Sequence, residues 1–285
     1  MSAVPHTFTL PHGDVQLQGY TWEPEHAPLA VLLIVHGHGE HAARYAHVAQ
    51  YLNQHGIAVM AYDQYGHGRS QGKKGHFPTY DYILDGIELF RYEAARVFPE
   101  IPLFLMGHSM GGNLVATYAL QLEPALQGVI LSAPWLRLAF KPSGLDLFLA
   151  KAMVNIYPSY TQSSKLDVTA ISRDPAEVDK YRQDPLIHDK VSPSLFLGVV
   201  EHGEWALEHA PDFSLPLLVM HGTGDRITDW AASEQFAARA GSDDVTFRQW
   251  EGYFHEMHNE APVHRAPILD TYRRWILDRL VPPQA

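Results

Sequence analysis

The amino-acid sequence predicts an α/β fold, in which a mostly parallel central sheet is flanked by helices and carries an inserted helical cap. Two observations lead to this prediction. Short, strongly apolar runs alternate with helical patterns of about 10 to 20 residues, which is typical of parallel strands joined by helices. Between residues 134 and 211 the alternation stops and no clean parallel strand is recognisable. We therefore expect a core formed by residues 1–133 and 212–285, and a cap, or lid, formed by residues 134–211.

The first strands differ from those that follow. Residues 7–10 and 15–22 flank the turn sequence Pro11-His12-Gly13-Asp14 and predict an antiparallel hairpin. The later strands are apolar throughout, as in a sheet buried on both faces, and we expect them at residues 30–35, 57–62, 103–106, 128–131, 217–220 and 245–250. Helical periodicity predicts helices at residues 42–54, 80–97, 111–122, 231–240 and 262–280.

One helix is predicted inside the cap. Apolar residues between Leu145 and Ile156 recur at helical spacing and extend nearly all round the helix. Burial between the core and the rest of the cap is the favoured interpretation, because only Asp146 and Lys151 add charge and no basic face is present. The alternative is a lid that contacts lipid, which would associate the protein peripherally with a membrane.

The composition narrows the possible functions. In 285 residues, 21 Lys and Arg stand against 32 Asp and Glu, a formal net charge of −11, and no basic run offers a site for nucleic acid. The longest apolar stretch, Leu29–Val35, is much shorter than the roughly 20 residues that cross a bilayer. Cysteine is absent, which excludes disulfides and thiol catalysis. Because we find no secretion signal, we expect a cytoplasmic protein.

A candidate nucleophile follows the strand at residues 103–106. Gly107-His108-Ser109-Met110-Gly111 is a G-x-S-x-G sequence between a predicted strand and a predicted helix. In this context the glycines permit a tight, strained turn that lifts the serine hydroxyl above the strand ends. The N-terminus of the following helix would place N–H groups where an oxyanion forms. The alternative is a Gly-Ser turn with no reactivity.

A serine nucleophile needs a base and an orienting carboxylate. Asp225 lies in a Gly-rich loop just after the strand at 217–220, where functional residues of parallel sheets collect. Asp229 competes with it, but its position suits the N-cap of the next helix better. His255 follows the last strand and completes the chain order Ser, Asp, His. His258, three residues later, is the competing base.

The loop after the strand at 30–35 reads His36-Gly37-His38-Gly39-Glu40-His41. Its glycines let the backbone approach a substrate carbonyl, so we expect the N–H of His38 to pair with that of Met110 as an oxyanion hole. The same residues resemble the H-x-H-x-D-H metal motif of metallo-β-lactamase-type hydrolases, which leaves a metallohydrolase as an alternative. His255-Glu256-Met257-His258 is one residue short of zincin spacing.

These motifs, in this order, resemble the monoacylglycerol lipases of the α/β-hydrolase superfamily, a group that also holds lysophospholipase-like enzymes. Residues 36–45 are similar to the family pattern HGxGEHxxRY, and residues 63–70 to its DxxGHGxS loop. Residues 107–112 read GHSMGG, as in many members. Within the cap, residues 172–174 and 178–186 resemble the family's cap segment, which is the specific part of the match.

The resemblance implies an α/β-hydrolase fold with Ser109 as nucleophile, Asp225 as acid, His255 as base, and no metal or cofactor. It further implies that the glycerol end of the pocket is shaped or polarised by Glu40, Arg44, His108 and Tyr181. Two departures stand out: His38 replaces an apolar residue of some members, and the cysteines that mammalian members carry near the site are absent.

The expected activity is therefore the hydrolysis of carboxylic esters of lipids, foremost of monoacylglycerol to glycerol and fatty acid through an acyl-enzyme. The main alternatives are a lysophospholipase, a general carboxylesterase or an aminopeptidase-like relative with the same triad. A metallohydrolase that uses the loop at residues 36–41 and a non-catalytic binding module on the same scaffold are further alternatives.

Overall fold

The computed structural model describes residues 4–141 and 144–280, with residues 145–147 described by their backbone alone. Its central sheet has the strand order β1-β2-β4-β3-β5-β6-β9-β10. The antiparallel part contains β1 (His6–His12) and β2 (Val15–Trp22), and β2 also pairs antiparallel with β4 (Ile57–Tyr62). The other strands run parallel to β4: β3 (Ala30–Val35), β5 (Leu103–His108), β6 (Gly128–Ser132), β9 (Leu217–Gly222) and β10 (Val245–Trp250).

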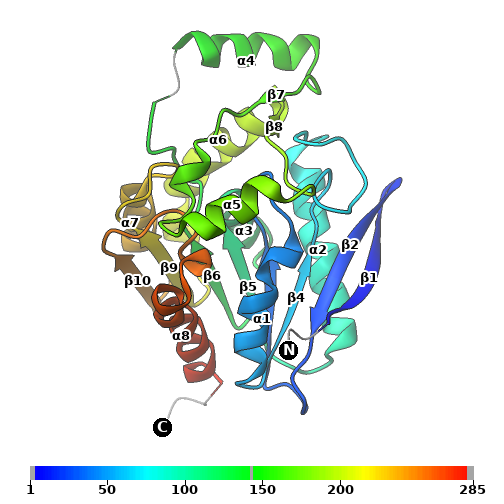
Figure 1. Ribbon diagram of the computed structural model, residues 1–285, viewed down its shortest axis with the longest axis vertical. Coiled ribbons are helices and arrows are strands. Elements are labelled where there is room, and N and C mark those ends of the chain that lie inside the picture. Colours follow the sequence, from blue (N-terminus) through cyan, green and yellow to red (C-terminus); the bar gives the residue numbers. More distant parts are fainter. Residues whose placement is uncertain (1–3, 142–143, 281–285) are drawn as a thin grey trace.

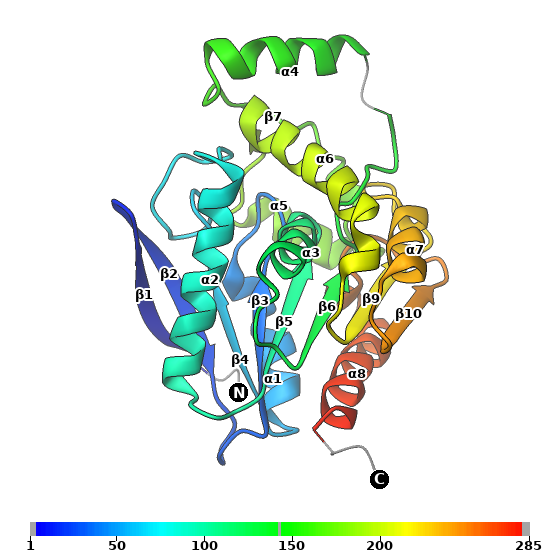
Figure 2. The same ribbon diagram turned by 180° about the vertical axis from the view of Figure 1, so that it is seen from behind.

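Helices cover both faces of this sheet (Figures 1 and 2). One face carries α1 (Ala46–Asn53) and α8 (Pro262–Asp278); the other carries α2 (Tyr80–Val97), α3 (Met110–Leu122) and α7 (Trp230–Arg239). These are the helices that the sequence predicts, except that the expected helix at 42–54 begins with a 3₁₀ turn, η1 (Ala42–Tyr45), before α1.

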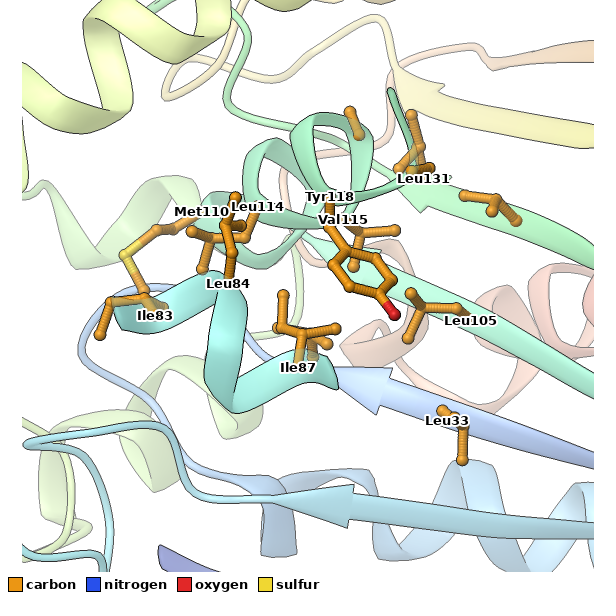
Figure 3. Close-up of a cluster of buried hydrophobic side chains, with 14 of the residues drawn as sticks. Leu33, Ile83, Leu84, Ile87, Leu105, Met110, Leu114, Val115, Tyr118 and Leu131 are labelled. Atoms are coloured by element: carbon orange, nitrogen blue, oxygen red, sulfur yellow. The ribbon is translucent and has the colours of Figure 1, made fainter. Parts of the chain in front are cut away.

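Strand alternation divides the core into two layers. In β3, Val31, Leu33 and Val35 pack with the α2 and α3 side, whereas Ala30, Leu32 and Ile34 pack with the α1 and α8 side. Successive side chains of a strand point to opposite faces, so an uninterrupted apolar strand fills both layers. Figure 3 shows the first layer, with Ile83, Leu84 and Ile87 of α2 close to the apolar side chains of α3.

The segment between β6 and β9 lies beyond the carboxyl ends of the parallel strands (Figure 1). It contains α4 (Gly144–Ile156), β7 (Gln162–Ser163), η2 (Val168–Ala170), α5 (Pro175–Gln183), β8 (Lys190–Val191), α6 (Pro193–Glu208) and η3 (Ala210–Asp212). The pairing of β7 with β8 is antiparallel and separate from the central sheet. The expected cap, residues 134–211, falls within this segment, which runs from the end of β6 at Ser132 to the start of β9 at Leu217, and its division from the core as a cap stays a prediction.

The burial expected for the cap helix is wrong. In α4, Phe148 is 67% exposed, Leu149 49% and Ile156 77%. Figures 1 and 2 show why: α4 is the outermost element of the cap segment, with α6 beneath it and no other described element above it. An all-round apolar helix can be buried only between two layers, and this segment supplies one. Across residues 4–141 and 144–280, no helix is both long and apolar enough to cross a membrane.

Candidate active site

Ser109 lies at a sharp turn between β5 and α3. Its backbone has φ 53° and ψ −119°, a conformation that costs a non-glycine residue on the order of 1–3 kcal/mol. The flanking glycines are needed because a Cβ at Gly107 would collide with the carbonyl oxygen of Gly111, and a Cβ at Gly111 with that of Val35. The N–H of Ser109 donates to the carbonyl of Ser132 on the neighbouring strand over 3.1 Å. The turn is therefore held both by the close packing around its two glycines and by the hydrogen bond to β6.

Asp225 and His255 are brought together by the loops after β9 and β10. The Nδ1–H of His255 donates to Oδ2 of Asp225 over 2.6 Å, and both residues are buried. The other carboxylate oxygen, Oδ1, accepts the N–H groups of Ile227 and Thr228 over 2.7 and 3.1 Å. Asp225 is thus held as an acceptor that orients the imidazole.

The protonation states follow from this pairing. Burial alone would raise the pKa of Asp225, but the positive charge of His255 and the hydrogen bonds from His221 and His255 hold that pKa far below its ordinary value. Burial alone would lower the pKa of His255, but the charge of Asp225 and their hydrogen bond raise that pKa above 6.5. The site therefore contains a fixed carboxylate and an imidazole of increased basicity.

Two hydrogen-bond partners of Asp225 were not predicted from the sequence. His221 donates from Nε2 to Oδ2 of Asp225 over 3.0 Å, and its Nδ1 lies 2.7 Å from Oγ of Ser233. The hydroxyl of Thr228 also donates to Oδ2, over 2.9 Å. His221 is the penultimate residue of β9, four residues before Asp225, and this placement at the carboxyl end of a parallel strand is the signal that could have revealed it.

The competing residues have other positions. Asp229 caps α7, because its carboxylate accepts the N–H of Ala231 over 3.0 Å, as the sequence predicts. His258 is buried, and its ring stacks on Tyr45 with 4.9 Å between centroids. Asp225 therefore pairs with His255, whereas His258 belongs to the packing behind it.

The residues on either side of Ser109 lie close to the two loops that the sequence assigns to the site. The ring of His108 lies 4.8 Å from the ring of His255, centroid to centroid. A Cβ at Gly37 would stand 3.1 Å from Cβ of Ser109, so the loop at 36–41 passes directly beside the serine. Met110 is the first residue of α3, and its N–H has no acceptor within the helix. Among the described residues, the N–H of His38 donates to no protein group.

Glu40 and Arg44 form part of a buried ion network. The guanidinium of Arg44 contacts Glu40 over 2.6 Å and forms two hydrogen bonds to Glu256, of 2.8 and 2.6 Å. Glu40 also accepts the N–H of Gly37 over 2.6 Å and the hydroxyl of Tyr45 over 2.9 Å. Burial would raise the pKa of Glu256, but Arg44 keeps that pKa below its ordinary value. One cation thus joins the loop at 36–41 to the loop that carries His255.

The other two residues assigned by the resemblance flank this network. The ring of Tyr181, from α5, lies 4.9 Å from the guanidinium carbon of Arg44. His108 is buried, and its Nδ1 lies 3.0 Å from the carbonyl of Ser132. Burial and the nearby charge of His255 lower the pKa of His108 to about 4. The structure brings all four residues close to the site, and contact with a substrate stays a prediction.

The side chains of the metal-like motif diverge. Nε2 of His36 accepts the N–H of Gln64 over 3.0 Å, Nε2 of His38 donates to the carbonyl of Lys190 over 2.8 Å, and Nε2 of His41 lies 2.8 Å from Asp184. Within the part of the chain that the structure describes, no group of three or more His, Asp or Glu side chains is arranged to hold a metal ion.

Comparison with known proteins shows the family to which the chain belongs. A family model described as serine aminopeptidase, S33, matches residues 26–262. The chain belongs to this family. A monoacylglycerol lipase of Mycolicibacterium smegmatis is 32% identical over 94% of this chain and 95% of its own length. The crystal structure of Paleococcus ferrophilus monoacylglycerol lipase has a TM-score of 0.84 and 31% identity, over 92% of this chain and 99% of that one.

A further relative is longer than this chain. An uncharacterized abhydrolase domain-containing protein of Dictyostelium discoideum is 38% identical over 91% of this chain, which spans 27% of that protein. The predicted α/β-hydrolase fold and the resemblance to monoacylglycerol lipases are confirmed. The family together with the similarity to monoacylglycerol lipases identifies the protein as a carboxylic ester hydrolase.

Proposed function

We propose that this protein hydrolyses monoacylglycerols to glycerol and fatty acid, with Ser109 as nucleophile, His255 as base and Asp225 as orienting acid. The observation that carries the proposal is the 2.6 Å hydrogen bond between Asp225 and His255, whose ring lies 4.8 Å from that of His108, the residue just before Ser109 in its strained turn. A buried carboxylate that fixes an imidazole next to such a serine is the arrangement that activates a hydroxyl for acyl transfer.

In this mechanism His255 takes the proton of Ser109 through Nε2 as the hydroxyl attacks the ester carbonyl. Asp225 holds the ring through Nδ1 and stabilises the imidazolium. The protonated ring then gives its proton to the leaving glycerol oxygen, which breaks the ester bond and leaves the fatty acyl group on Ser109. Water that loses a proton to His255 attacks this acyl-enzyme, and the protonated ring then returns that proton to Oγ of Ser109 as the fatty acid is released. The N–H groups of His38 and Met110 bind the oxyanion in both halves of the reaction.

Two lines of support point to a lipid substrate. Two similar proteins carry the name monoacylglycerol lipase, with at least 90% of this chain matched in each case. The cap segment also lies beyond the carboxyl ends of the parallel strands, and its outermost helix, α4, exposes apolar side chains. Each CH₂ of an acyl chain that is buried beneath such a segment adds about 0.8 kcal/mol to binding, so a long chain has much to gain.

The substrate class is tested by turnover of four compounds with the purified protein: a monoacylglycerol, a lysophosphatidylcholine, a short p-nitrophenyl ester and an aminoacyl arylamide. We expect kcat/KM to be highest for the monoacylglycerol. Hydrolysis of the short ester without hydrolysis of the monoacylglycerol would contradict the proposal. A preference for the lysophospholipid would make the protein a lysophospholipase, and cleavage of the arylamide an aminopeptidase.

The pH dependence of the reaction tests the role of His255. Only the neutral imidazole accepts a proton, so kcat/KM should fall as the pH is lowered through the pKa of His255, which Asp225 raises above 6.5. His108, with a pKa lowered to about 4, does not titrate in this range. The Asp225→Asn variant removes the charge that raises this pKa, so its residual activity should persist to lower pH. A pH profile at constant ionic strength measures both, and equal acid limbs would contradict the assignment.

We further propose that α4 contacts a lipid surface, where an amphiphilic substrate is concentrated. Its exposed Phe148, Leu149 and Ile156 form an apolar face that no other described segment covers, and monomeric proteins rarely leave such faces uncovered unless they have a function. Leu149→Lys combined with Phe148→Lys should reduce co-sedimentation with phosphatidylcholine vesicles at least about fivefold, since each charge opposes insertion. Leu122→Lys is the matched control, because Leu122 lies on α3 and its side chain is 51% exposed, close to the 49% of Leu149. Equal vesicle binding by all variants would refute the contact.

A further inference from the structure

The cap segment reaches down to the proposed oxyanion hole through one short stretch, residues 184–192, which we name the strap. His188 donates its backbone N–H to the carbonyl of Gly39 over 3.0 Å. The imidazole of His38 donates from Nε2 to the carbonyl of Lys190 over 2.8 Å. Nε2 of His41 lies 2.8 Å from Oδ2 of Asp184. Three contacts in succession thus tie the strap to residues 38–41.

The fit between strap and loop is close. Gly39 has φ 78°, and a Cβ at this position would collide with the carbonyl oxygen of His188. On the other side of the strap, a Cβ at Gly75 would collide in the same way with the carbonyl oxygen of Lys190. The two glycines let the strap backbone lie against the core, so the position of Lys190 and the position of the loop determine each other.

On its other side, the loop is held by the core. The N–H of Gly37 donates to Glu40, which Arg44 connects to Glu256. His38 is therefore held at two points. The backbone of its neighbour Gly37 is hydrogen-bonded to Glu40 of the core, and its own side chain is hydrogen-bonded to Lys190 of the strap. The backbone N–H of His38 donates to no protein atom among the described residues.

We infer that His38 is a positioning residue: its imidazole, bonded to the carbonyl of Lys190, aims the backbone N–H of His38 at the oxyanion. This inference rests on the proposed function and deepens it, because it assigns the cap segment a part in catalysis in addition to covering the acyl chain. A carbonyl oxygen accepts, so Nε2 of His38 must carry the proton, and burial favours this neutral form by lowering the pKa of His38.

The physical consequence is specific. An oxyanion donor acts on charge that develops only in the transition state, so a misaimed N–H lowers kcat and leaves KM nearly unchanged. Removal of a donor costs about 10²–10³-fold in kcat, and a displaced donor should cost less, about 10- to 100-fold. A role in folding or in substrate binding would not produce this division between kcat and KM.

The test compares His38→Leu, His38→Gln and His38→Asn with the wild-type protein. The leucine cannot donate, the glutamine amide can reach the Lys190 carbonyl, and the asparagine amide is too short to reach it. We expect kcat for a p-nitrophenyl ester to fall about 10- to 100-fold in the Leu and Asn variants, with KM within about threefold, and to recover to within about threefold of wild type in the Gln variant. The rate of fluorophosphonate labelling should follow kcat, because the phosphonyl oxygen occupies the same hole.

His76→Leu is the matched control. The ring of His76 also joins the core to the cap segment, through Oγ of Ser194 at 2.9 Å and Oγ of Ser192, the last residue of the strap, at 3.3 Å, but it contacts neither Lys190 nor the loop at 38–41. Its kcat should stay within about twofold of wild type. Equal losses in His76→Leu and His38→Leu, a kcat unchanged in His38→Leu, or a Gln variant no better than the Asn variant would each overturn the inference. If the Leu variant does not fold, the Gln and Asn pair decides. Labelling of wild-type Ser109 tests the proposed function separately, since its absence would refute that proposal whatever His38 does.

Discussion

Replacement of Ser109 by alanine should lower kcat/KM by about a millionfold, because the nucleophile of an acyl-transfer triad acts as a unit with its base and acid. Fluorophosphonate labelling should disappear with it. The measurement is turnover of the preferred ester and intact-mass analysis after labelling. Ser132→Ala, which removes a buried hydroxyl at the end of the adjacent strand, is the control and should retain label and activity. A labelled Ser109→Ala protein would place the nucleophile elsewhere.

A second substitution at Ser109 distinguishes the loss of the nucleophile from the strain of the turn. The backbone of Ser109, with φ 53°, is strained for any residue that has a Cβ. Ser109→Gly should therefore be as inactive as Ser109→Ala but more stable than it by about 1 kcal/mol. Thermal or urea unfolding of the two variants measures this difference. Equal stabilities would indicate that the surrounding contacts, rather than the strain, dominate the energy of the turn.

Replacement of Arg44 by methionine should have the largest effect on stability. Arg44 is the cation between Glu40 and Glu256, whose side chains are only 3% and 4% exposed. Its removal leaves two buried carboxylates without a counter-charge, and breaking a buried ion pair in this way costs about 3–5 kcal/mol. Urea unfolding followed by circular dichroism measures the loss. Activity should fall as well, because the network holds both the loop beside Ser109 and the loop that carries His255.

A surface pair provides the control for this prediction. Arg182 contacts Asp179 over 3.4 Å, with both side chains more than half exposed. Solvent screening makes such a pair nearly neutral, so Arg182→Met should change the free energy of unfolding by less than about 1 kcal/mol. A similar small change in Arg44→Met would show that water or a relaxed loop compensates the buried carboxylates, and that the network does not hold the site together.

Local patterns were sufficient for the sheet and its helices. The strands at 15–22, 30–35, 57–62 and 245–250 and the helix at 80–97 have the predicted bounds. Uninterrupted apolar runs are typical of strands buried on both faces, and the two core layers account for them. Ser109, Asp225 and His255 could be selected for the same reason: each follows a predicted strand, and the carboxyl ends of parallel strands meet at one edge of a sheet.

The sequence by itself determined which segments form the sheet, where its flanking helices lie along the chain, and which three residues are candidates for acyl transfer, because all of this is encoded in short-range periodicity and in position after a strand. Only the tertiary structure decided the rest. The bond of His221 to Asp225, the sharing of Arg44 between Glu40 and Glu256, and the contact of the strap with His38 join residues 4 to 212 positions apart, and loops carry no periodicity that predicts such meetings. The exposure of α4 was decided in the same way, since the number of layers around a helix depends on the packing of its neighbours and not on its own residues.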